Sequence, residues 1–137
     1  MDRVRVPLAS SVVRWSLVAV VAGTILAASV VRPTGAPAGP GPFGVFGMDK
    51  YLHFLAYAGL ATALVYALVG TNTDRVAVVV FVAAVGFGLF VELLQLPLGY
   101  RTFSLADAAA NAVGATVVTA GWRLARTRVR FRPVAVD

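Results

Sequence analysis

The sequence predicts an all-α integral membrane protein in which four transmembrane helices form a compact bundle. Of its 137 residues, 59% are hydrophobic and only 13% are charged, whereas an ordinary soluble domain is about half apolar and a quarter charged. A chain of this length cannot bury so much apolar surface in a water-soluble core. The apolar residues also gather in four long runs, each close to the roughly 20 residues that a helix needs to cross a bilayer.

Each run is apolar all round, which is typical of a helix in lipid, because a surface helix carries only one apolar stripe. No charged residue interrupts the first run, and His53 alone interrupts the second. The third run carries its polar residues near its end and the fourth near its start. The predicted spans are 15–31, 51–70, 76–96 and 104–122.

The connections between the runs favour loops. Segment 33–47 holds four prolines and five glycines, neither of which supports a helix interior. Segment 70–75 is a short turn, and segment 97–103 separates the third run from the fourth. Ser104 and Asp107 have the spacing of a capping box, with aspartate in the place of the usual glutamate, and predict the start of the fourth helix.

The first run admits two interpretations. Arg3, Arg5 and Arg14 precede it, and small residues occupy 27–29, as in a cleaved signal peptide. The apolar run is long for a signal core, which favours a retained first span. Either interpretation gives the same orientation for the later spans.

The basic residues predict the orientation of the bundle. With both termini in the cytoplasm, nine lysine and arginine residues lie on the inner side and three on the outer side, as the positive-inside rule expects. Segment 1–14 is then a cytoplasmic tail and 123–137 a basic cytoplasmic tail. The arginines of the second tail suit anionic lipid or serve only as a topology signal. We do not interpret the excess of arginine as a nucleic-acid-binding site, since no soluble domain carries these residues.

Polar residues of the last three runs gather at the outer end of this topology. They stand at the start of the second run, at the end of the third, in the loop that follows, and at the start of the fourth. We predict that they form one site. Its candidate residues are Asp49, Lys50, His53, Tyr57, Glu92, Gln95, Arg101, Asp107 and Asn111.

Their spacing predicts that these residues face other helices. Residues three or four positions apart share a helix face, as Asp49, His53 and Tyr57 do, and small residues such as Gly88 and Gly114 share a face with the polar residues of the later runs. Small residues let membrane helices approach closely. A lipid-facing carboxylate at this depth would cost on the order of 1 kcal/mol or more. We therefore expect partners for the acids, and the available side chains are those of Lys50, His53 and Arg101.

Three ordered blocks of sequence resemble the VanZ-like family of membrane proteins. They are DKYLHFLAYAGLA at 49–61, ELLQ at 92–95, and R-x-F-S-L-x-D-x-x-x-N-x-x-G from Arg101 to Gly114. Together they extend over nearly half of the chain. The resemblance implies a small multi-span helical protein of the cell membrane. The family's namesake is associated with resistance to the glycopeptide teicoplanin, so the resemblance also implies a role at the cell envelope.

Four functions remain open for the polar cluster. It would bind or sense an amphiphilic or cell-envelope molecule at the outer leaflet, or serve only as a hydrogen-bonded clasp between helices. A membrane-embedded enzyme would use His53 as a general base beside Glu92 or Asp107, although no nucleophile motif is visible. A transporter is disfavoured because no inverted repeat is seen. No cofactor or metal is expected, because the chain has no cysteine and no H-E-x-x-H spacing.

Overall fold

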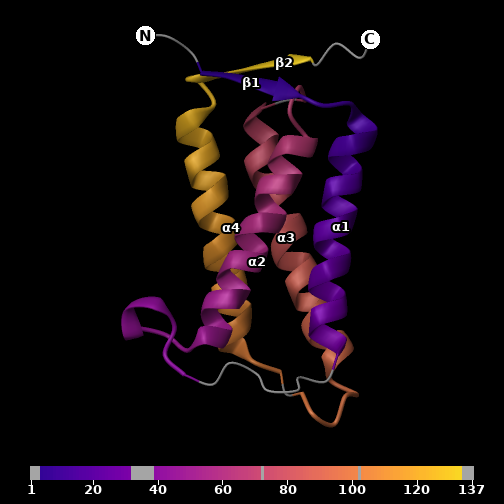
Figure 1. Ribbon diagram of the computed structural model, residues 1–137, viewed down its shortest axis with the longest axis vertical. Helices are drawn as coiled ribbons and strands as arrows, with labels where there is room; N and C mark the ends of the chain where they lie inside the picture. The colour runs from indigo at the N-terminus through magenta and orange to yellow at the C-terminus, as the bar shows by residue number, and fades with distance from the viewer. Residues whose placement is uncertain (1–3, 32–38, 72, 102, 134–137) are drawn as a thin grey trace.

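The computed structural model describes residues 4–31, 39–71, 73–101 and 103–133, and Arg3 and Arg32 of the predicted charge pattern lie outside them. Four long helices run alternately up and down, and two short strands lie across one end (Figure 1). The elements are β1 Val4–Leu8, α1 Ser11–Val30, the 3-10 turn Pro42–Gly44, α2 Met48–Ala67, α3 Thr73–Gln95, α4 Leu105–Ala125 and β2 Val129–Pro133.

The helices begin and end where local chemistry directs them. Ser10 and Ser104 cap α1 and α4, each accepting a hydrogen bond from the backbone N–H three residues on, as serine does at an N-cap. The tight turn between α2 and α3 uses Gly70 at φ 96°, a left-handed conformation that glycine adopts without strain. The predicted all-α class is confirmed for these helices.

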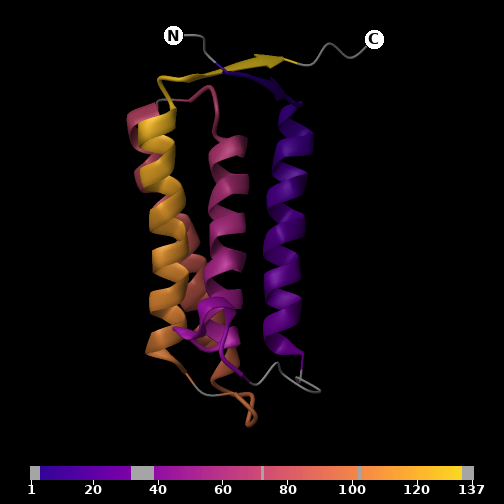
Figure 2. The same cartoon turned by 60° about the vertical axis from the view of Figure 1, so that its left-hand side comes forward.

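Helix α2 is the centre of the bundle. It contacts the other three helices and packs most extensively against α4, while α1 stands at the edge (Figure 2). The apolar core lies along α2 and is completed by α3 and α4. Its most deeply buried members are Tyr57, Leu60, Ala61, Val80, Ala84 and Ala115.

Two helices, Ser11–Val30 and Arg75–Gln95, are long and apolar enough to cross a membrane. Of the 18-residue apolar window in each helix, 6% is buried inside the protein in the first and 39% in the second, so most of each window is not buried by the rest of the chain. Large apolar side chains such as Val20 on α1 and Val82 on α3 are more than 60% exposed.

The strands were not predicted, and they change the description of both terminal segments. β1 and β2 pair in parallel, with Val4 opposite Val129 and Val6 opposite Phe131. Parallel strands need a long crossover, and here the whole four-helix bundle supplies it. The segments 1–14 and 123–137, predicted as tails, thus form a small sheet within their described residues.

Side chains of α1, α2 and β2 attach this sheet to the bundle. The Tyr66 hydroxyl accepts from Ala9 N at 2.9 Å and donates to Pro7 O at 3.0 Å, and its ring lies 6.5 Å from that of Phe131. Arg14 donates to three carbonyl groups at the end of α2 at 2.9–3.1 Å. Two of them, the carbonyls of Tyr66 and Ala67, belong to the last turn of α2, where backbone donors are few, and the third, that of Val69, follows the helix. Arg14 thus caps the end of α2 from a neighbouring helix.

Candidate functional site

The predicted polar residues lie at the end of the bundle opposite the sheet. This end holds the starts of α2 and α4, the end of α3 and the loop between α3 and α4 (Figure 1). Because successive helices run in opposite directions, these helix ends lie at the same level of the bundle, as the sequence predicted. The cluster divides into an ionic group between α2 and α4, a set of helix caps, and a cavity beside α1.

Lys50 forms the ionic link between α2 and α4. Its ammonium Nζ lies 2.6 Å from Asp107 Oδ1 and also contacts the Asp49 carboxylate. The Asp107 side chain is 18% exposed and the Asp49 side chain 59% exposed, so the Asp107 contact is the better shielded. The Asp107 and Asp49 carboxylates raise the pKa of Lys50, and the hydrogen bond from Lys50 lowers the pKa of Asp49.

His53 extends this group one turn further along α2. Its Nδ1 lies 3.2 Å from Asn111 Oδ1, and its Nε2 lies 3.7 Å from Asp107 Oδ2. An amide oxygen can only accept, so Nδ1 carries the proton in this contact. Asn111 is 2% exposed, and His53 satisfies its oxygen. Five predicted residues, Asp49, Lys50, His53, Asp107 and Asn111, are therefore joined by direct contacts.

The start of α4 is capped by two side chains from different helices. Asp107 N donates to Ser104 Oγ at 3.2 Å, and Ser104 N donates to Glu92 Oε2 at 3.1 Å. In an ordinary capping box the acid three residues on would accept the second bond. Here Glu92 of α3 takes that place, which leaves the Asp107 carboxylate to pair with Lys50. Glu92 is 2% exposed and does not bond the charges of α2, contrary to the expected pairing.

Gln95 forms its hydrogen bond with α1 and not with the ionic group. Its Nε2 donates to Ser29 O at 2.8 Å, and Tyr100 Oη donates to Val30 O at 2.6 Å. These acceptors are among the last carbonyls of α1, which have no partners within that helix. Tyr100 was missed in the sequence because it lies in a loop, with no periodicity to mark it.

Small residues allow the close packing around Tyr57, which is 1% exposed. A Cβ placed on Gly88 of α3 would lie 3.0 Å from both Tyr57 Cε1 and Asn111 Nδ2. A Cβ on Gly114 would lie 2.4 Å from the carbonyl oxygen of Phe54. The glycines thus set the spacing that lets Asn111 reach His53.

A cavity of about 310 Å³, here called the slot, opens beside α1 at this end of the bundle. The side chain of Arg101 lines it, and its Nε is buried without a hydrogen-bond partner in the described part of the chain. The walls combine polar residues at the end of the bundle with apolar residues of α1 and α2. The lining residues are Ile25, Ala28, Ser29, Asp49, Leu52, His53, Ala56, Tyr57, Gln95 and Arg101.

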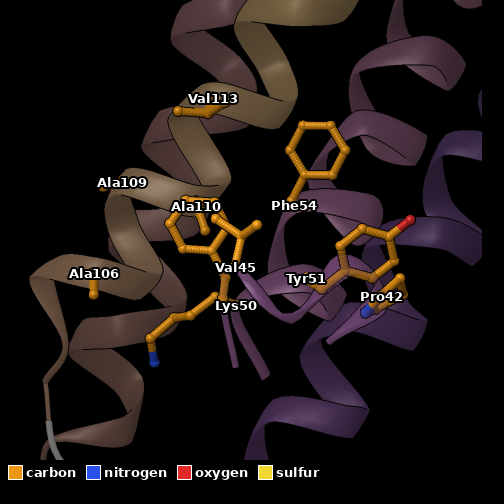
Figure 3. Close-up of a pocket in the computed structure, with 10 residues that line it drawn as sticks. Pro42, Val45, Lys50, Tyr51, Phe54, Ala106, Ala109, Ala110 and Val113 are labelled. Carbon is orange, nitrogen blue, oxygen red and sulfur yellow. The ribbon is translucent and has the colours of Figure 1, made fainter. Parts of the chain in front are cut away.

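A second, more apolar groove of about 570 Å³ lies between α2 and α4. Figure 3 shows Phe54 and Val113 along it, with Val45 of the preceding loop beside it and Lys50 at its edge. Among the residues that line this groove, Lys50 is the only charged one. In residues 4–31, 39–71, 73–101 and 103–133, no three acidic or histidine side chains are placed to hold a metal ion.

No protein-family model matches the chain, and no curated protein or solved structure is similar to it. The resemblance to the VanZ-like family therefore remains a prediction from the three sequence blocks.

Proposed function

We propose that the protein is a four-span membrane protein whose outer end binds an amphiphilic molecule. The observation that carries this proposal is an inverted distribution of polarity. Glu92, Gln95, Asn111 and Thr119 are buried, while the outer surfaces of α1 and α3 carry exposed valine, leucine and phenylalanine. Water would penalise that arrangement, whereas a bilayer favours apolar residues outside and polar residues in the bundle interior.

Exposed threonines support the same environment. The hydroxyl groups of Thr24, Thr62 and Thr116 each donate to the carbonyl four residues earlier, at 2.7–2.8 Å. In water such hydroxyls find solvent partners, but in lipid they must be satisfied by the protein itself. Helix α2 packs against both of the two most apolar helices and α4 packs against α3. Their lengths are similar to those of α1 and α3, so we extend the proposal to all four.

The predicted charge pattern supports an orientation with both termini in the cytoplasm. The slot then opens at the outer leaflet. Its polar end holds Arg101, His53 and Gln95, while Ile25 and Ala56 contribute apolar wall. A molecule with a polar head and a hydrocarbon tail matches this division, because ligand sites combine apolar walls with a few polar groups. The resemblance to VanZ-like proteins supports a role at the cell envelope.

A mass-spectrometric experiment tests the proposal. Ala56→Trp fills the slot, and Ala83→Trp adds the same side chain to an exposed position on α3. Native mass spectra of each protein, released from a neutral detergent, report which amphiphiles remain bound. We expect a bound amphiphile on the wild type and Ala83→Trp, and its loss from Ala56→Trp. An amphiphile retained equally by all three proteins would exclude the slot as the site.

A structural clasp is a second candidate function, favoured by the contact of Lys50 with Asp107 between α2 and α4. A clasp alone predicts that His53→Ala lowers the unfolding temperature and that no amphiphile stabilises the wild type. The proposed binding function predicts ligand-dependent stabilisation of the wild type. Thermal unfolding with and without added lipid separates the two.

A further inference from the structure

Two basic residues of the described chain lie at the outer end, Lys50 and Arg101. Arg101 differs from Lys50 because it has no acidic partner. Lys50 shares its ammonium group between the carboxylates of Asp49 and Asp107. Arg101 forms no salt bridge within the described residues, and its Nε is buried without an acceptor. A buried donor without a partner costs free energy, more so on a charged group. Arg101 thus offers an unused guanidinium edge at the slot.

The other slot residues define what kind of group fits beside that edge. Gln95 already donates its Nε2 to Ser29 O, and the carboxylate of Asp49 is held by Lys50. His53 directs Nδ1 toward Asn111. Arg101 is therefore the charged group of the lining that contacts no partner of opposite charge within the described residues, and its donors repel a cationic head and attract an anionic one.

We infer that the slot takes an amphiphile with an oxyanion head, a phosphate or a carboxylate, bound by Arg101. This inference rests on the proposed function and adds the chemical class of the ligand. A guanidinium group is planar and presents paired N–H donors that match the two oxygens of a carboxylate or phosphate. The tail would lie along Ile25, Ala28, Leu52 and Ala56, the apolar wall of the slot.

Lipid-binding measurements on the purified full-length protein test this inference. The probes are dioleoylphosphatidylglycerol, dioleoylphosphatidylcholine, oleate and inorganic phosphate, each titrated in a neutral detergent. We expect the two anionic amphiphiles to bind about tenfold more tightly than phosphatidylcholine, as one charge-assisted hydrogen-bond pair allows. Arg101→Gln should abolish this preference, and Arg101→Lys should keep part of it.

Arg123→Gln is the matched control, because it removes one exposed arginine from the opposite end of the bundle. It should keep the preference of the wild type. Loss of the preference in both glutamine variants would mean that net charge alone sets it, and would overturn the inference. If Arg101→Gln fails to fold, the inference is tested by the wild type alone, through its preference for the anionic amphiphiles over phosphatidylcholine.

The remaining outcomes separate the inference from the proposed function. Equal affinity of the wild type for phosphatidylglycerol and phosphatidylcholine would overturn the oxyanion head and leave amphiphile binding intact. No binding of any lipid would overturn both. Inorganic phosphate that binds as tightly as phosphatidylglycerol would support an oxyanion site at Arg101 and overturn the contribution of the tail.

Discussion

At the residue scale, the ionic group of Lys50, Asp49 and Asp107 links α2 to α4 through a single ammonium. The pKa of Lys50 is raised above its ordinary value of 10.5, so its stabilising contribution is complete below that pH and lost as pH rises through the raised pKa. The pKa of Asp49 is lowered from 3.8, so its contribution is complete above that pH and lost as pH falls through the lowered pKa.

This linkage predicts a pH-dependent effect of Lys50→Met. The wild type should unfold at a higher temperature than the variant between the two pKa values. The difference should shrink at pH values above the raised pKa of Lys50, where the wild type also loses the charge. Differential scanning fluorimetry of both proteins in detergent measures it. A constant difference through the alkaline range would show that the charge of Lys50 contributes nothing.

Gly114 gives a second prediction at this scale. Gly114→Ala places a Cβ 2.4 Å from the carbonyl oxygen of Phe54, so α2 and α4 must separate, at a cost of about 1–3 kcal/mol. Gly121→Ala on the same helix meets no atom within 4 Å and should leave stability unchanged or slightly higher. The unfolding temperatures of the two variants in detergent check this. Equal losses would contradict the account, because alanine favours a helix more than glycine does and only Gly114 lies close to the neighbouring backbone.

The sequence predicted that the polar residues would face other helices. This holds for the buried Glu92, Gln95 and Asn111 but not for Asp49, whose side chain is 59% exposed, and not all of the pairings were predicted. The four-residue spacing of Asp49 and His53 indicated a shared face, since helical periodicity fixes direction within one helix. The partner of a residue depends on the rotation of the neighbouring helix, which periodicity within one sequence does not determine. Glu92 was therefore assigned to a basic side chain, whereas it accepts from the Ser104 backbone.

At the scale of elements, the start of α4 depends on Glu92 from α3. Glu92→Gln keeps a carbonyl oxygen for the Ser104 N–H and should retain most of the stability. Glu92→Leu leaves that donor without an acceptor and should cost about 1–3 kcal/mol. Chemical unfolding of both variants in detergent tests this difference. If the glutamine variant lost as much as the leucine variant, the negative charge and not the acceptor would be the cause.

The four helices were predictable and the two strands were not. Long apolar runs identify helices whatever their neighbours are, and the predicted spans overlap α1 to α4 closely. The alternation of arginine with valine and phenylalanine at 128–131 also fits a strand, whose side chains alternate between faces. From the sequence we instead predict a basic cytoplasmic tail, because the partner strand, β1, lies at the other end of the chain. Pairing across that distance has no local signal.

At the scale of the whole molecule, the sheet lies at one end of the bundle (Figure 2). The helix ends that carry the polar cluster lie at the other end. The proposed membrane lies between them, with the exposed apolar faces of α1 and α3 in contact with lipid. The polar cluster then faces outward and the sheet faces the cytoplasm. The proposed placement of the amphiphile site at the outer leaflet depends on this orientation.

Cysteine labelling on intact cells tests that orientation most directly, because the chain has no cysteine of its own. Gly99 is exposed in the loop between α3 and α4, and Thr127 is exposed between α4 and β2. We predict that a membrane-impermeant thiol reagent labels Gly99→Cys on intact cells and labels Thr127→Cys only after the cells are lysed. Labelling of Thr127→Cys on intact cells, with Gly99→Cys protected until lysis, would contradict the outward placement of the site.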